Sequence, residues 1–139
     1  MFYFAYGSNL NKKQMKVRCK DSIFIKKIIL KNYILTFRSK YGVADIDKKR
    51  GSKVYGALYK ISKSDESKLD VYEEYPTLYK KMFFKNDQNI LMTYIMVKKT
   101  NKTIPTARYL NTVKRGYRDR KISLKSLNAA LLLSKHPRQ

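Results

Sequence analysis

The sequence predicts an α+β fold with a small, strongly curved or barrel-like sheet of about six or seven mostly antiparallel strands and three or four helices. Three observations predict it. Short aromatic or β-branched runs recur between residues 2 and 97, mostly as neighbouring pairs. Capping residues and helical spacing occur in four places. No repeat or linker divides the chain, and its 43% hydrophobic content suffices for a core, so we expect one domain over residues 1–139.

The first elements are a strand, a turn, a helix and a pair of strands. Phe2–Ala5 is a short aromatic-rich strand that runs into a Gly-Ser-Asn turn. A helix follows, because Asn11 and Gln14 resemble a capping box. The next two β-rich segments are separated by a short polar stretch, and we expect them to form a hairpin: Ile23–Leu30 and Tyr33–Phe37.

The middle of the chain predicts two more strands and a helix. Tyr41–Ile46 is a short strand candidate, and Asp47–Lys53 is a basic loop. Val54–Ile61 alternates between its two faces, as a strand does. Ser62 or Ser64 caps a helix with acidic residues in its first turn, and that helix ends before Pro76.

The last third predicts a hairpin followed by two helices. Leu78–Phe84 and Ile90–Val97 are joined by a turn-prone Asn-Asp-Gln-Asn sequence. Pro105 opens a helix that Gly116 is placed to end. A final helix covers Ser123–Leu133.

The charge of the chain is strongly positive, with 32 basic and 10 acidic residues giving a formal net charge of +22. Such a field attracts polyanions. The basic residues recur in short groups along the whole chain, which is typical of a solvated surface, and no nucleic-acid recognition module is visible. The sequence contains neither a membrane-spanning run nor a leader peptide, and we expect a cytoplasmic protein. A single cysteine, Cys19, excludes an internal disulfide and is interpreted as a small buried hydrophobic residue.

Acidic residues concentrate in one segment, since half of them lie between positions 65 and 74. The simplest interpretation is a helix kept soluble by its acids. Glu73 and Glu74 differ from the others, because they lie between two tyrosines next to a proline that stops the helix. Partial desolvation there would raise a carboxyl pKa toward the range useful for proton transfer.

The turn Gly7-Ser8-Asn9-Leu10 is a second candidate site. Backbone N–H groups at the start of a helix bind carboxylate or phosphate, although the pattern alone also fits an ordinary turn. His136 lies too near the chain end to be expected as the base of a triad. No Cys/His cluster has the spacing of a metal site, and the turn lacks both the lysine of a P-loop and the three-glycine spacing of a dinucleotide fold.

Together these segments resemble the gamma-glutamyl cyclotransferase-like (AIG2-like) family over nearly the whole chain. The N-terminal signature is matched by residues 4–10, and the central strands by residues 42–46 and 54–59. The segment that carries the family's catalytic glutamate is similar to residues 69–73, and three later residues fit its remaining pattern: Tyr79, Tyr109 and Gly116. One position departs from the family: a glycine usually follows the glutamate, whereas here Glu74 does. If the backbone there needs φ > 0, this residue is strained.

The resemblance implies conversion of a gamma-glutamyl amide or amine into 5-oxoproline and a free amine, without a cofactor or a metal. The substrate's α-amine attacks its own γ-carbonyl, and Glu73 is the expected acid/base, favoured over Glu74 by the motif register. We expect the substrate to be held by the loop and two tyrosines: Tyr6, Gly7, Ser8, Asn9, Leu10, Tyr79 and Tyr109.

The partner expected from this resemblance is a small gamma-glutamyl compound, with no membrane and a monomeric or homodimeric state. The positive surface favours anionic leaving groups, such as those of gamma-glutamyl amino acids or glutathione, over polyamines. A different interpretation of the +22 charge is a catalytically inactive member of the fold that binds nucleic acid or another polyanion.

Overall fold

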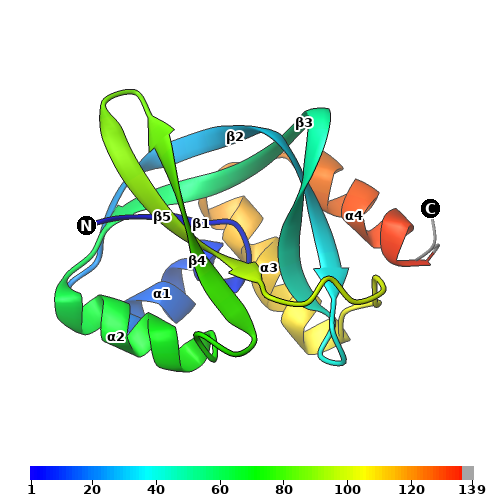
Figure 1. Cartoon of the computed structure of the whole chain (residues 1–139), viewed down its shortest axis with the longest axis horizontal. Helices are drawn as coiled ribbons and strands as arrows, with labels where there is room; N and C mark the ends of the chain where they lie inside the picture. Colours follow the sequence, from blue (N-terminus) through cyan, green and yellow to red (C-terminus); the bar gives the residue numbers. More distant parts are fainter. Residues whose placement is uncertain (136–139) are drawn as a thin grey trace.

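The computed structural model describes residues 1–135 and contains a curved five-stranded sheet with helices packed against part of it, an α+β fold as predicted (Figure 1). The strand order is β2-β3-β1-β5-β4, with β1 and β5 parallel and the other pairs antiparallel. His136 lies outside the described residues. The elements are β1 (Phe2–Ala5), a 3-10 turn η1 (Ser8–Leu10), α1 (Lys12–Arg18), β2 (Ile23–Arg38), β3 (Val43–Lys60), α2 (Lys63–Tyr72), β4 (Tyr79–Asn86), β5 (Asn89–Met96), α3 (Ala107–Asp119) and α4 (Lys125–Lys135).

The predicted number of strands was wrong, because two pairs of expected strands are each continuous. The predicted hairpin at Lys31-Asn32 is a bend within β2, and the predicted loop Asp47–Lys53 is part of β3. At the bend, the Gly51 N–H donates to Asn32 Oδ1 at 3.0 Å. Because one residue of β2 faces four of β3 there, the two strands bend together as one ribbon (Figure 1).

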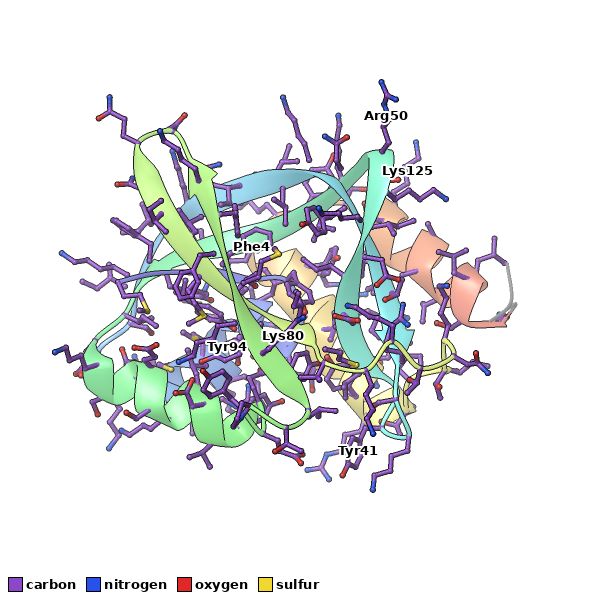
Figure 2. All side chains as sticks on the ribbon, viewed as in Figure 1. Phe4, Tyr41, Arg50, Lys80, Tyr94 and Lys125 are labelled. Carbon is purple, nitrogen blue, oxygen red and sulfur yellow. The ribbon has the colours of Figure 1, made fainter. Side chains whose placement is uncertain are left out.

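Strand β1 is central in the sheet, hydrogen-bonded to β3 on one side and to β5 on the other. Phe4 is fully buried and lies in the interior in Figure 2. By contrast, Arg50 projects from the bend of the β2–β3 ribbon away from the molecule (Figure 2). The central position of β1 carries its C-terminal turn, residues 6–10, into the middle of the molecule, where the turn is largely buried.

The two predicted helix starts in the first half are confirmed. The Asn11 side chain accepts a hydrogen bond from the Gln14 N–H at 3.0 Å and caps α1. Ser62 caps α2 in a reciprocal capping box with Asp65. Cys19, after α1, is 1% exposed, and burial raises the pKa of its thiol to about 12, which fits the structural interpretation of this residue.

Gly116 does not end α3, contrary to the sequence prediction, since the helix continues to Asp119. Its role is close packing. A Cβ at this position would lie 2.6 Å from both the Asn11 nitrogen and the Leu10 Cβ, so α3 approaches the turn after β1 at a distance that glycine alone permits.

Replacing Gly116 by Ala is therefore expected to lower the free energy of unfolding by about 1–2 kcal/mol. Overpacking costs about 1–3 kcal/mol, and helix propensity returns at most about 1 kcal/mol. Chemical denaturation measures the difference. The exposed substitution Asn111→Ala on the same helix is the control and should change stability by less than about 0.5 kcal/mol. Equal stability of Gly116→Ala and wild type would contradict the close-packing role.

In the part of the chain that the structure describes, no helix is both long and apolar enough to cross a membrane. Within residues 1–135 there is likewise no group of three or more histidine, cysteine or acidic side chains that could hold a metal ion.

Candidate active site

A cavity of about 280 Å³ lies where the turn after β1, the C-terminal end of α2 and the start of β3 meet. Tyr79, Thr93 and Tyr94 of the β4–β5 hairpin and Tyr109 of α3 complete its wall. Seven of the eight residues predicted from the sequence line it: Tyr6, Gly7, Ser8, Asn9, Glu73, Tyr79 and Tyr109. The eighth, Leu10, is fully buried and packs toward α3 instead, and its N–H is bonded to the Gly7 carbonyl.

Glu73 is the residue after the last turn of α2, where its N–H donates to the Leu69 carbonyl at 2.8 Å. Its side chain is half-buried in the cavity wall, and within residues 1–135 its carboxylate has neither a hydrogen-bond donor nor a salt-bridge partner. Burial raises the pKa of Glu73 from 4.5 to about 7, and the positive charge of Arg18 offsets part of that effect. The carboxyl group is therefore poised to exchange protons near neutral pH.

Glu74 has a left-handed backbone with φ of +51°, which confirms that a positive φ is needed at this position. Its carbonyl accepts hydrogen bonds from the N–H groups of Thr77 and Leu78, at 2.9 and 2.8 Å, and these bonds hold the turn. A non-glycine residue in this conformation costs about 1–2 kcal/mol. The sequence departure from glycine thus introduces both local strain and a second carboxylate, exposed at the cavity.

The turn Gly7-Ser8-Asn9 lines the cavity and carries three backbone N–H groups. Within residues 1–135, the structure gives the N–H groups of these three residues no acceptor. A Cβ at Gly7 would lie 3.1 Å from the Ala44 Cβ and 3.3 Å from the Tyr109 hydroxyl, so the turn fits closely against its neighbours. Such a turn has the free donors that an anionic group requires.

Asn9 fixes the turn in place. Its side-chain nitrogen donates to the Tyr3 hydroxyl at 3.0 Å, and its carbonyl accepts from the Tyr59 hydroxyl at 2.8 Å. Its side-chain oxygen accepts a hydrogen bond from the Arg18 guanidinium. These contacts leave Asn9 itself 2% exposed and make the backbone of the turn rigid.

Tyr79 and Tyr109 both anchor the backbone of Ala44 at the start of β3. The Tyr79 hydroxyl donates to the Ala44 carbonyl, while the Tyr109 hydroxyl accepts from the Ala44 N–H at 3.0 Å. Burial raises the pKa of both phenols, so both stay neutral. The hydrogen of the Tyr109 hydroxyl has no acceptor within residues 1–135, and it remains available to a group in the cavity.

The model of one protein family, "Gamma-glutamyl cyclotransferase, AIG2-like", matches residues 3–111, which is most of the chain and includes every residue discussed so far in this cavity. The chain belongs to this family. The sequence-based recognition is confirmed by this match.

A bovine (Bos taurus) gamma-glutamylcyclotransferase is 32% identical over 80 residues, which are 51% of this chain and 43% of the bovine protein. The match therefore spans less than half of the length of that relative.

Solved structures share the fold at lower identity. One described as a gamma-glutamyl cyclotransferase superposes with a TM-score of 0.78 at 22% identity, covering 94% of this chain and 85% of its own. The uncharacterized human (Homo sapiens) protein loc79017 gives 0.76 at 22% identity over 93% and 85%. YkqA from Bacillus subtilis gives 0.75 at 23% identity, covering all of this chain and 54% of YkqA.

Several residues around the cavity of this AIG2-like fold were not predicted from the sequence. The Arg18 guanidinium lies over the Tyr72 ring, 3.3 Å from its centroid, and the Tyr72 hydroxyl lies 3.0 Å from Ser8 Oγ. Tyr94 extends from β5 toward α2, where its hydroxyl donates to Asp70 at 2.6 Å (Figure 2). The local sequence does not mark these residues as part of a site, because Arg18 meets Tyr72 through the packing of α1 against α2, and Tyr94 reaches Asp70 from a strand far along the chain.

A buried ion-pair network holds β3 next to the cavity of this family member, and it too was missed. Asp45 is fully buried and accepts from the Met96 N–H at 2.9 Å. Its carboxylate pairs with Arg38 at 3.1 Å and with Lys99 at 2.7 Å. Because Asp45 follows Ala44, the network fixes the backbone to which both cavity tyrosines are bonded.

Proposed function

We propose that this protein converts a gamma-glutamyl amide or amine into 5-oxoproline and a free amine, with Glu73 as the acid/base. One observation carries the proposal. An unpaired, half-buried carboxyl group with a pKa near 7 faces the same cavity as the free N–H groups of the Gly7-Ser8-Asn9 turn. That pairing supplies an anion-binding element and a proton-transfer group, which this cyclisation requires.

The turn would bind the α-carboxylate of the glutamyl group. The backbone N–H groups are held rigidly by Asn9, so they lose little entropy when they donate hydrogen bonds to an anion. Fixing the carboxylate brings the α-amine close to the γ-carbonyl in a folded conformer. For an intramolecular attack, such positioning accounts for much of the rate enhancement.

Glu73 would move two protons in turn. Its carboxylate takes a proton from the α-ammonium group, whose nitrogen then forms a bond to the γ-carbon. Glu73 gives this proton to the leaving nitrogen as the bond between that nitrogen and the γ-carbon breaks. It then takes the second proton from the ring nitrogen and passes it to the departing amine. The products are 5-oxoproline and the free amine in its ammonium form, with no net change in protonation of the enzyme. A pKa near the working pH suits both halves of this cycle.

Tyr109 would stabilise the negative charge that develops on the γ-oxygen. Its hydroxyl already accepts from the Ala44 N–H and retains a hydrogen to donate into the cavity. Tyr79, whose hydroxyl hydrogen is bonded to the Ala44 carbonyl, would shape the pocket instead. Donors aimed at a developing oxyanion are an effective form of transition-state stabilisation.

The proposal is tested by measuring 5-oxoproline release from a panel of gamma-glutamyl amines, amino acids and peptides as a function of pH. Because the basic form of Glu73 starts the reaction, kcat/KM should fall about tenfold per pH unit below about 7 and level off above it. A pH-independent rate between pH 5 and 7 would contradict the role of Glu73.

The same measurement separates the enzyme from a polyanion-binding protein. If no member of the panel releases 5-oxoproline, and the protein binds DNA or RNA with an affinity that falls steeply with salt, the function is polyanion binding. It would then depend on the +22 charge and not on the cavity.

A further inference from the structure

The cavity has a local charge opposite to that of the whole protein. The chain carries a net charge of +22, yet the described residues that line the cavity include two carboxylates, Glu73 and Glu74, and no lysine or arginine. The rest of the lining is aromatic, aliphatic or neutral polar. The net charge of the chain therefore does not predict the charge that a bound substrate meets, because Glu73 and Glu74 determine it locally.

The two carboxylates occupy different depths. The floor of the cavity is formed by buried residues such as Tyr6, Asn9 and Thr93. The rim is formed by exposed side chains: Tyr41 at 46%, Tyr72 at 41%, and Glu74. Tyr41 lies at the turn between β2 and β3, at the edge of the molecule (Figure 2). Glu73 is half-buried, whereas Glu74 is exposed at the rim, on the side from which the cavity opens to solvent.

Two cations close to the rim tyrosines are engaged by other groups. Arg18 donates to Asn9 and is stacked on the Tyr72 ring, and it does not line the cavity. Lys40 lies over the Tyr41 ring, with its nitrogen 5.1 Å from the centroid, and it does not line the cavity. Within residues 1–135, Glu74 has no salt-bridge partner at 4 Å or less.

We propose that Glu74 is a specificity-determining residue that selects gamma-glutamyl amines whose leaving group carries a second, positively charged ammonium group. The inference rests on the proposed function and adds the chemical class of the leaving amine. The glutamyl half binds at the floor near Glu73, and the leaving amine extends past the rim, where its distal ammonium pairs with Glu74. The exposed rings of Tyr41 and Tyr72 offer further faces for a cation.

The nearby carboxylate of Glu74 has a larger effect on the choice of leaving group than the net charge of the whole protein. Charges on the protein surface beyond about 8–10 Å are screened at physiological salt, while a carboxylate at contact distance is not. The overall field therefore raises the arrival rate of anions without stabilising them at the rim. This reverses the preference for anionic leaving groups that the composition predicts.

Three substrates of similar length test the inference: gamma-glutamyl conjugates of 1,4-diaminobutane, n-pentylamine and 4-aminobutanoate. Their leaving groups end in a cation, an apolar group and an anion. For the wild type, kcat/KM should fall in that order, by about three- to tenfold at each step, as expected for one partly exposed ion pair. The ordering should weaken as salt is raised.

Two variants assign the preference to Glu74. In Glu74→Gln, the ratio of the cationic to the apolar substrate should come close to one, while the apolar substrate is turned over as in Glu66→Gln. Glu66→Gln is the matched control, because it removes the same charge from α2 at a residue paired with Lys81 outside the cavity. Glu74→Gly should behave like Glu74→Gln, and it also relieves the positive φ, so a folding defect cannot explain both results.

The outcomes are distinct. Loss of the preference in both Glu74 variants but not in Glu66→Gln supports the inference. Turnover of all three conjugates at equal rates, or fastest turnover of the 4-aminobutanoate conjugate, overturns it and leaves the proposed function standing. No turnover of any gamma-glutamyl compound in the wild type overturns the proposed function, and the inference with it.

Discussion

Replacing Glu73 by Gln should lower kcat for 5-oxoproline release by about 10²–10⁴-fold, the usual contribution of a general acid/base. The amide is nearly isosteric with the carboxyl group but cannot accept and return a proton. Glu73 has no hydrogen-bond or salt-bridge partner within residues 1–135, so the substitution breaks no contact, and circular dichroism should match the wild type. Steady-state kinetics with the n-pentylamine conjugate measures the effect.

Glu74→Gln is the informative comparison for this substrate, because it removes the neighbouring carboxylate without touching the proposed proton-transfer group. Its kcat should stay within a few-fold of the wild type. If Glu74→Gln were the inactive variant and Glu73→Gln the active one, the acid/base would be Glu74 and the assignment from the motif register would be wrong. Equal activity of both variants and wild type would exclude either carboxylate as the base.

The same Glu73→Gln variant should be more stable than the wild type at pH 8 by about 3 kcal/mol, and equally stable at pH 4. The folded protein raises the pKa of Glu73 from 4.5 to about 7, so the native state binds this proton more tightly than the unfolded chain does. The stability associated with the protonated group is complete below pH 4.5 and is lost as the pH rises through about 7. The gap between the two pKa values corresponds to about 3 kcal/mol.

Denaturant unfolding of both proteins at several pH values measures this difference. Comparing the two removes the large contribution of the +22 charge, which acts on both alike. Glu66→Gln serves as the control, and its stability relative to the wild type should not rise between pH 4 and pH 8. A constant difference between Glu73→Gln and wild type across this range would show that the Glu73 pKa is not raised in the folded state.

Local sequence signals predicted the elements whose causes are themselves local. The caps of α1 and α2 were recognisable, because these bonds join residues three apart. For α2 the sequence left Ser62 and Ser64 as alternatives, and the structure selects Ser62. The signals failed where long-range pairing decides. Lys31-Asn32 contains the polar residues of a turn, yet β2 continues through it, because β3 bends alongside and the Gly51 N–H bonds to Asn32. Gly116 has the residue type of a helix end, but the approach of Leu10 explains it.

The sequence alone determined the family pattern and the α+β class. It also showed that the turn at residues 6–10 and the glutamate at position 73 occur together as motifs of one family, because such motifs depend on residue order. Only the tertiary structure decided that the two motifs lie in one cavity and that burial raises the Glu73 pKa. It also decided the charge of that cavity: the protein has a net charge of +22, yet the described lining residues include two carboxylates and no lysine or arginine. The physical reason is that burial and charge proximity arise from contacts between residues such as Tyr3 and Tyr94, which lie far apart in the chain and whose meeting depends on the order of the strands.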